Sequence, residues 1–413
     1  MKQISDNDLE LYIHIPFCVR KCNYCDFVSF AGCEDQYDAY IDALCEEIRR
    51  SAGEFRDRRI VSVYIGGGTP SVLSCDQISR LVRTLRSEFP IHNVKGKRRG
   101  LRLQKKIRPA VEFSIEVNPG TVDKEKLSCY HRLGINRLSI GLQSSDDQDL
   151  LTLGRIHNYD DFVETFDRAR AAGFDNINVD LMQAIPGQSL PAWKRVLALV
   201  GAWKPEHISA YSLIVEEGTP FGQMQAEGRL ELPDEDSERE IYYYTKEFLE
   251  KSGYHRYEIS NYAVPGSECI HNIGYWKRTE YLGLGLNASS LIGNTRWKNT
   301  ADLGRYLSFY GARNQDQSQS RDLNSVREEI TSLSLKDQME EFIFLGLRLT
   351  VGISLQEFLD TFHQDLGFVY GDNLRRLIDM GMIERADDRI RLTECGIDVS
   401  NKVFSELLFV DEK

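Results

Sequence analysis

The segment YIHIPFCVRKCNYCDF, residues 12–27, is the stretch on which the predicted fold depends. A short run with two isoleucines is followed by Cys18, Cys22 and Cys25 in a C-x₃-C-x₂-C spacing. Three thiolates at this spacing can bind three irons of a 4Fe–4S cluster and leave the fourth iron without a protein ligand. A small molecule can bind that open iron and receive an electron from the cluster.

Two other uses of closely spaced cysteines fit this chain less well. A zinc site normally combines two C-x₂₋₄-C elements, or one such element with histidines, and the sequence offers no second pair. A disulfide network is disfavoured because the chain has nine cysteines and shows no secretory signal. The cysteines outside the motif are scattered, and we interpret them as small buried apolar side chains.

Length and composition indicate a multidomain globular protein. A chain of 413 residues is too long for one ordinary core and suggests two or three domains. Hydrophobic residues make up 41% and charged residues 28% of the sequence, and no apolar run approaches the ~20 residues that cross a bilayer. We therefore expect a cytoplasmic protein, a compartment that suits free thiols and an oxygen-sensitive cluster.

The charge distribution argues against general nucleic-acid binding. The net charge is −12, whereas affinity for nucleic acids comes from Lys and Arg on phosphates. Residues 92–108 are the exception, with eight Lys/Arg and no acid. We interpret this basic segment as a solvated loop; contact with anionic lipid, nucleic acid or a partner is the alternative.

The first half of the chain alternates short β-branched runs with helical patterns, as βα units do. The predicted strands are residues 11–16, 61–65, 111–117, 137–141, 176–181 and 207–213, and the predicted helices are 35–50, 75–88, 124–133, 160–172 and 190–203. Six strands indicate a parallel sheet but fall short of the eight that close a full barrel. The sequence thus predicts an α/β fold with a partial (β/α)₆ barrel.

Polar, glycine and cysteine residues follow successive predicted strands. The cysteine loop follows the first strand, and Gly66-Gly67-Gly68-Thr69-Pro70 follows the second; Glu116, Gln143 and Asp180 end the next three. Parallel barrels place their chemistry at this edge. Glycines here let backbone groups approach a ligand closely, although a sharp turn needs the same residues.

The spacing leaves the role of the charged residues at this edge open. Glu116 and Asp180 could accept hydrogen bonds from a ribose hydroxyl or an ammonium group, or could pair with Arg137 or Arg155. Gln143 and Arg155 could contact a ligand or be satisfied polar residues of the core. The spacing alone favours neither role over the other.

The second half departs from the βα pattern. Residues 231–240 form an acidic linker or helix start, and His271-Asn272-Ile273-Gly274-Tyr275-Trp276 is an aromatic cluster with one imidazole. Such a cluster could cover a flat ligand, and histidine can ligate iron, but packing is the common role of a lone histidine beside aromatic rings.

The C-terminal region has the order of a winged-helix domain. Helices are predicted over residues 354–365 and 372–380, followed by a hairpin over 382–393 that turns at Ala386-Asp387-Asp388. A DNA-binding role is disfavoured because the hairpin that would form the wing is acidic. We therefore interpret this region as a structural domain that packs against the rest of the protein. We predict domains at 1–215 (the partial barrel), 216–330 (an extension with the aromatic cluster) and 331–413.

These motifs together resemble a known family. Tyr12-x-His14-x-Pro-Phe-Cys-x₃-Cys-x₂-Cys, Gly-Gly-Gly-Thr-Pro, Glu116-Val-Asn-Pro and Gly141-x-Gln143 resemble the radical S-adenosylmethionine (SAM) enzymes, over most of the chain. More narrowly, they resemble the branch with oxygen-independent coproporphyrinogen III oxidases and the HemW-type haem chaperones. The oxidase pattern has a fourth cysteine where this chain has Phe27, and the chaperone pattern has phenylalanine there together with H-N-x-x-Y-W, so the chaperone type is favoured.

The resemblance implies roles for matching residues. Cys18, Cys22 and Cys25 would ligate the cluster, and His271 would be the candidate haem contact. The SAM-site positions are Tyr12, Tyr24, Gly67, Gly68, Thr69, Glu116, Gln143, Arg155 and Asp180. The implied function is binding of haem as cargo and its transfer to acceptor proteins; the alternative is oxidative decarboxylation of coproporphyrinogen III. Reductive SAM cleavage, peripheral membrane contact and a homodimer are left open.

Overall fold

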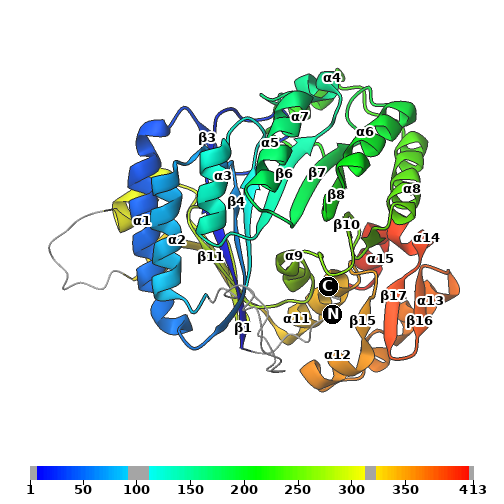
Figure 1. The fold of residues 1–413 in the computed structure, drawn as a ribbon. Coiled ribbons are helices and arrows are strands. Elements are labelled where there is room, and N and C mark those ends of the chain that lie inside the picture. The colour runs from blue at the N-terminus through cyan, green and yellow to red at the C-terminus, as the bar shows by residue number, and fades with distance from the viewer. Residues whose placement is uncertain (1–6, 92–110, 312–321, 409–413) are drawn as a thin grey trace, which may run out of the picture.

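A computed structural model describes residues 7–91, 111–311 and 322–408 (Figure 1). A large sheet forms the centre of the molecule, and the helices of the first half cover its outer side. The C-terminal residues form a smaller unit, drawn in orange and red, that contacts both ends of this sheet through the Arg296–Glu341 and Arg256–Glu394 ion pairs. The basic segment at 92–108 lies outside the described residues.

The barrel core consists of six parallel strands that are adjacent in chain order, as predicted. Each strand hydrogen-bonds to the next, in the order β1-β4-β5-β6-β7-β8. Their bounds are β1 Asp8–Ile15, β4 Arg59–Gly67, β5 Glu112–Val117, β6 Arg137–Gln143, β7 Ile177–Gln183 and β8 His207–Ser212. Each new strand is added on the same side of the one before it, and the sheet curves into a partial barrel.

The predicted helices between these strands are present, with ends shifted by a few residues. They are α1 Tyr37–Ser51, α2 Cys75–Glu88, α3 Lys124–Arg132, α5 Tyr159–Ala171 and α6 Leu190–Trp203; a short α4, Asp147–Thr152, follows β6 as well. Local signals explain their starts. Ser74 and Gln77 form a capping box at α2, and Asn158 and Asp161 form another at α5.

Residues 216–330 extend the same sheet at both ends, so the described sheet has twelve strands rather than the six of the predicted barrel. At one end β11 pairs in parallel with β1 and continues into antiparallel β12, β13 and β14, and at the other end β10 and β9 follow β8. Their bounds are β9 His255–Arg256, β10 Asn261–Ala263, β11 Tyr281–Leu284, β12 Ser289–Ile292, β13 Thr295–Asn299 and β14 Arg327–Ser332.

The helices of this extension are α7 Pro220–Ala226, α8 Glu235–Lys251, α9 Ile270–Trp276 and α10 Leu303–Tyr310. The acidic stretch predicted at 231–240 contains the start of α8, where the Asp234 side chain accepts a hydrogen bond from the Ser237 amide. Helix α9 carries the aromatic cluster and lies against the inner face of the barrel, because its Gly274 faces Glu10 of β1 and its His271 contacts Ser62 of β4.

The C-terminal unit has the predicted helix–helix–hairpin order. It comprises α11 Leu335–Gly346, β15 Ile353–Ser354, α12 Leu355–Phe362, α13 Leu366–Asp379, β16 Ile383–Ala386, β17 Arg389–Leu392, α14 Glu394–Asp398 and α15 Ser400–Glu406. Asp387, with φ of 51°, is in the turn between β16 and β17. Helix α13 starts six residues before the predicted position, because Asp365 caps it despite two glycines in its first turns.

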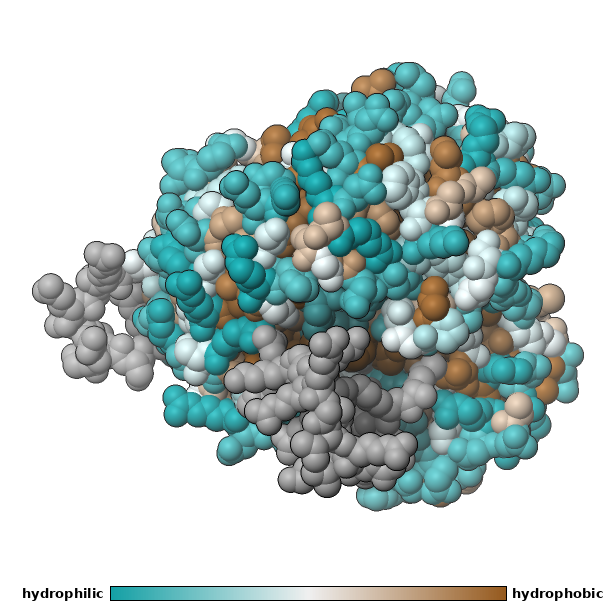
Figure 2. Space-filling view, in the orientation of Figure 1, coloured by the Kyte–Doolittle hydropathy of each residue, from teal (hydrophilic) through white to brown (hydrophobic). Residues whose placement is uncertain are grey.

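Ionic and aromatic contacts join the C-terminal unit to the barrel. Glu341 of α11 pairs with Arg278, at 3.0 Å, and with Arg296, at 2.7 Å. The Arg348 guanidinium lies 4.6 Å from the ring centroid of Trp276, the last residue of α9. On the face in Figure 2, hydrophilic residues predominate and hydrophobic ones are scattered among them. In the described ranges, no helix combines the length and apolar character that a membrane span needs.

Candidate functional site

The cysteine loop follows β1 at the edge where the parallel strands end. Cys18 lies in the two-residue strand β2 (Phe17–Cys18), which pairs with β3 (Phe30–Ala31) and thereby closes the loop at its base. Cys18 is buried, whereas Cys22 and Cys25 are partly exposed, and all three thiols are free. The loop is compact, because the Cys25 amide donates to the Cys22 carbonyl at 3.3 Å.

The glycine loop lies directly against the cysteine loop. The amides of Gly68 and Thr69 donate to the carbonyls of Ile15 and Phe17, at 2.9 and 2.7 Å. A Cβ at Gly68 would lie 2.6 Å from the Phe17 carbonyl oxygen, so no other residue fits without a shift of the backbone. The Thr69 hydroxyl donates to the Cys18 sulfur at 3.5 Å. This loop therefore fixes the position of the first thiol.

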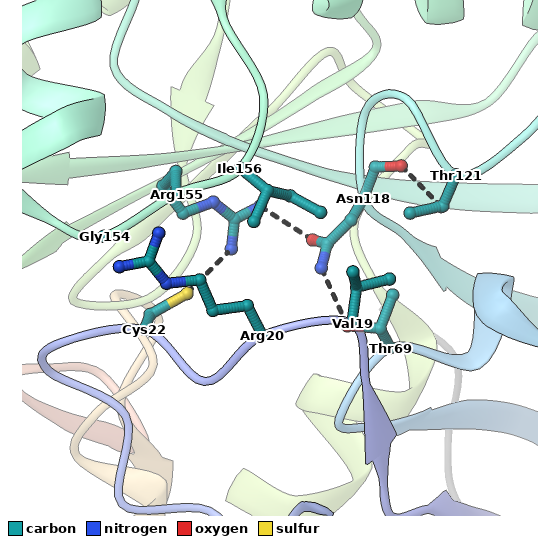
Figure 3. A pocket seen from close by; sticks show the side chains of 9 residues that line it. All are labelled: Val19, Arg20, Cys22, Thr69, Asn118, Thr121, Gly154, Arg155 and Ile156. Atoms are coloured by element: carbon teal, nitrogen blue, oxygen red, sulfur yellow. Dashed lines mark hydrogen bonds between the residues drawn. The ribbon is translucent and has the colours of Figure 1, made fainter. Parts of the chain in front are cut away.

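Asn118 and Arg155 connect the glycine loop to the second thiol (Figure 3). Arg155 lies with Nη1 3.6 Å from the Cys22 sulfur, and its Nη2 donates to Asn118 Oδ1 and to the Gly141 carbonyl, at 2.8 and 2.7 Å. Asn118 Nδ2 donates to the Thr69 hydroxyl at 2.8 Å. These side chains line a small pocket that also includes Cys22. A guanidinium here stabilises thiolates and attracts a carboxylate ligand.

The Glu116 and Asp180 carboxyl groups lie inside the barrel without forming an ion pair to either arginine that the sequence suggested. Glu116 accepts hydrogen bonds from the Tyr64 hydroxyl and the Gly67 amide, both at 3.0 Å. Asp180 accepts hydrogen bonds from Ser139, at 3.0 Å, and from Asn178, at 2.7 Å. Desolvation in the barrel raises the pKa of Glu116 to about 7 and raises the pKa of Asp180 as well.

The raised pKa of Glu116 predicts a pH dependence of stability. The folded state holds the proton up to about pH 7, whereas the usual carboxyl pKa is 4.5, so this group's contribution to stability is present below pH 4.5 and is lost as the pH rises to 7. Between pH 5 and 8, the cofactor-free wild type should lose about 2 kcal/mol more unfolding free energy than the Glu116→Gln variant. Urea unfolding at both pH values measures this difference; the exposed Glu231→Gln variant should follow the wild type, and identical losses in all three proteins would contradict the assignment.

Gln143 has a strained backbone at the end of β6. Its φ is 73°, in the left-handed region, where β6 makes a bulge against β7 between Gly141 and Gln143. A Cβ at Gly141 would lie 3.2 Å from Gln143 Nε2 and 3.4 Å from Arg155 Nη2. The Gln143 amide and the Arg155 guanidinium therefore both lie close to Gly141. Seven other non-glycine residues of the described chain share this conformation, so the backbone of Gln143 alone does not identify a functional site.

Tyr24 and Tyr12 have different neighbours at this edge. Tyr24 is within hydrogen-bonding reach of Arg155 and packs beside Leu153 and Phe221. Tyr12 instead lines a second, larger cavity of about 360 Å³ that is open to solvent. The hydroxyl of Tyr12 and the Nδ1 of His14 are 3.0 Å apart, and His14 lines the same cavity.

His271 lies beneath this larger cavity rather than in its wall. It is 2% exposed, its Nδ1 is 2.8 Å from the Ser62 hydroxyl, and its Nε2 has no partner among the described residues. Its ring packs against Tyr275, with centroids 4.8 Å apart, and against Tyr64, 5.0 Å apart. Burial lowers the pKa of His271 to about 3, so the imidazole is neutral at physiological pH.

The structure therefore brings most predicted site residues together and separates two, Tyr12 and His271. Around the cysteine and glycine loops it gathers Cys18, Cys22, Cys25, Tyr24, Gly67, Gly68, Thr69, Glu116, Gln143 and Arg155, with Asp180 on the neighbouring strand. Sequence reasoning gave no role to Asn118, which bridges Thr69 and Arg155, or to His14 and Tyr64. Asn118 and His14 could have been assigned to the site from the sequence, because each lies in a motif that contains an assigned residue.

The donor set suits an iron–sulfur cluster better than a single metal ion. Within the described ranges, no three His, Cys, Asp or Glu side chains stand close enough to hold one ion. A 4Fe–4S cluster has no such requirement, because each thiolate binds a different iron. Cys22 and Cys18 both act electrostatically on Cys25, so the three thiols share one loop region. The residues present fit a cluster with three protein ligands.

Comparisons with known proteins agree with this geometry. Residues 12–200 match the radical SAM superfamily, and residues 333–399 match the HemN C-terminal domain. The haem chaperone HemW of Lactococcus lactis subsp. lactis is 34% identical over 97% of this chain and 97% of its own length. The haem chaperone HemW of Bacillus subtilis is 34% identical over 96% of this chain and 98% of its own length.

A solved structure shares the fold. The coproporphyrinogen III oxidase HemN from Escherichia coli superimposes with a TM-score of 0.78 over 97% of this chain and 89% of its own, at 24% sequence identity. The predicted barrel and C-terminal helical unit are therefore confirmed as a known architecture.

Proposed function

Because this chain belongs to the HemW family of the radical SAM superfamily, we propose that it binds haem and transfers it to acceptor proteins. The observation that carries the proposal is the relationship to HemW proteins over nearly the full length, which includes the C-terminal unit. Phe27 and the His271–Trp276 helix are consistent with it, since they match the chaperone pattern at the positions that distinguish it from the oxidase pattern.

In this proposal Cys18, Cys22 and Cys25 hold a 4Fe–4S cluster, which supplies an electron and an open iron for SAM. The chain's own residues orient the ligand. Arg155 attracts the carboxylate of SAM, backbone groups of Gly67 and Gly68 approach its amino group, and Glu116 and Asp180 accept hydrogen bonds from hydroxyl or ammonium groups. The barrel wall around them limits access of water to the cluster.

The proposed acceptors are haem proteins, such as those of respiration, and the proposed compartment is the cytoplasm. His271 remains the proposed haem contact of the aromatic helix. In this structure Tyr275 packs edge-on against its ring, and Tyr12 lies with its centroid 6.3 Å away. Direct binding of haem iron by His271 therefore requires Tyr275 or Tyr12 to move aside, while an indirect role through these two rings requires no movement.

Haem titration of the anaerobically reconstituted protein tests this proposal. We expect a saturable Soret shift with about one haem per chain, and an affinity weakened about tenfold or more in His271→Ala, because the neutral imidazole supports or binds the cargo. The exposed His131→Ala variant is the matched control and should bind as the wild type does. The absence of a saturable shift in the wild type would contradict the chaperone proposal, and wild-type affinity in His271→Ala would remove that residue from the site.

The alternative activity, oxidative decarboxylation of coproporphyrinogen III, is tested by a separate assay. The barrel-edge residues suit a SAM enzyme as well as a chaperone, so the protein should be incubated anaerobically with SAM, a reductant and coproporphyrinogen III. We expect no more than background protoporphyrinogen IX, together with haem transfer from the loaded protein to a haem-free acceptor. Efficient product formation without haem transfer would replace the chaperone proposal with the oxidase.

A further inference from the structure

A chain of hydrogen bonds joins two thiols of the cysteine loop through Asn118 (Figure 3). The Arg155 guanidinium lies 3.6 Å from the Cys22 sulfur and donates to Asn118 Oδ1 at 2.8 Å. Asn118 Nδ2 donates to the Thr69 hydroxyl at 2.8 Å, and that hydroxyl donates to the Cys18 sulfur at 3.5 Å. Asn118 thus contacts both of the side chains that donate to these two thiols.

The chemistry of the two neighbours determines which way the Asn118 amide points. A guanidinium carries only donors, so the amide oxygen must face Arg155 and the amide NH₂ must face Thr69. Because the Thr69 oxygen accepts from this NH₂, its own proton is directed to the Cys18 sulfur. The amide oxygen also holds Nη2 of Arg155, while Nη1 points to Cys22. One amide therefore orients a donor on each thiol.

The Asn118 backbone is held in place independently of its side chain. Its amide donates to the Ser71 hydroxyl at 3.1 Å, and its carbonyl accepts from the Thr121 hydroxyl at 2.7 Å. These two hydroxyls are themselves 2.6 Å apart. Pro119 follows and disfavours helical conformations at Asn118. The side chain therefore projects from a fixed backbone, as a residue that orients other side chains must do.

We infer that Asn118 is a positioning residue that sets the reduction potential of the cluster; the inference rests on the proposed binding of a 4Fe–4S cluster and SAM. It acts through two donors, the Thr69 hydroxyl and the Arg155 guanidinium. Hydrogen bonds and positive charge beside the thiolate sulfurs stabilise the reduced cluster, because reduction adds a negative charge. The contact with Asn118 also holds Arg155 in place for the carboxylate of SAM.

Asn118→Asp tests this role with little change in shape. The carboxylate cannot donate to Thr69, so the Thr69 hydroxyl donates to it instead of to Cys18, and the new negative charge offsets that of Arg155. At a fixed ambient potential, we expect the ratio of reduced to oxidised cluster to fall about tenfold, a shift of about 59 mV for one electron. A redox titration of the anaerobically reconstituted protein, monitored by EPR, measures this shift. The affinity for SAM should weaken about tenfold on the same samples.

Asn401→Asp is the matched control, because Asn401 is exposed on α15 in the C-terminal unit. It adds the same charge and should keep the wild-type potential and SAM affinity. Thr69→Val removes only the donor to Cys18 and should lower the potential by a smaller amount than Asn118→Asp. In the double variant of Thr69 and Asn118, the shift should be smaller than the sum of the two single shifts, because both changes remove the same hydrogen bond.

Iron content identifies variants that fail to assemble the cluster. If Asn118→Asp loses its iron, the neutral Asn118→Ala variant decides, and its reduced-to-oxidised ratio should fall several-fold. A wild-type potential in the iron-loaded Asn118 variants would overturn the inference, and so would additive shifts in the double variant. A wild type that assembles no cluster would overturn it together with the cluster assignment.

Haem titration of the same samples separates this inference from the proposed function. Saturable haem binding by a wild type whose Asn118 variants show no shift in potential would remove only the role of Asn118. A shifted potential in Asn118→Asp, with no haem binding by the wild type, would support the role of Asn118 and contradict the chaperone proposal.

Discussion

Replacing Cys22 with serine is expected to reduce the iron content of the anaerobically reconstituted protein from about four atoms per chain to background. The serine hydroxyl is a poor ligand for iron in place of a thiolate, and a cluster with only two cysteine ligands is lost. The same change removes the sulfur contact of Arg155, at 3.6 Å. Iron and sulfide counting on purified protein measures the result.

Cys395→Ser is the matched control, because Cys395 is exposed on α14 in the C-terminal unit, away from the cysteine loop. It should retain the wild-type iron and sulfide content. Full iron content in Cys22→Ser, or an equal loss in Cys395→Ser, would remove the cluster assignment and with it the proposed SAM site.

Replacing Gly274 with alanine is expected to destabilise the folded protein by about 3 kcal/mol. A Cβ at Gly274 would overlap the Glu10 carboxyl group, which is fully buried and cannot swing out to solvent. Glu10 lies 3.7 Å from His271 Nδ1, and burial raises its pKa well above the usual range. The clash would displace α9 from the barrel, so haem binding should weaken along with stability.

Gly53→Ala is the matched control for this change. Gly53 lies in a 3₁₀ turn after α1, and a Cβ there would meet no atom within 4 Å. Thermal or urea unfolding should show a small effect for Gly53→Ala and a large loss for Gly274→Ala. A Gly274→Ala protein as stable as the control would show that α9 does not pack on Glu10 as described.

The barrel was predictable because its signals are local. Each of the six strands is a buried run followed by a helix, and α2, α3, α5 and α6 begin with a side-chain cap, so strand order and direction follow from the βα pattern. The added strands lack such signals. Strands β9 and β10 have two and three residues, and β11 pairs with β1 across some 270 positions of sequence. Only tertiary packing specifies them.

The site was predictable in part for the same reason. Cysteines and glycines at strand ends mark positions where backbone and thiols must approach a ligand, and these residues do gather. The partners of Glu116 and Asp180 were not predictable, since hydrogen bonds from Tyr64, Gly67, Ser139 and Asn178 depend on strand register. The position of His271 below the cavity depends on α9 entering the barrel, which no local pattern indicates.

The contacts of α9 also limit how this protein can be recombined with its relatives. The helix ends at Trp276, which lies under Arg348, and the following Arg278 pairs with Glu341. A chimera that exchanges only the C-terminal unit would bring foreign partners to these two residues and disturb the helix whose other side faces Glu10. In functional hybrids, residues 270–278 and the C-terminal unit should therefore come from the same parent protein.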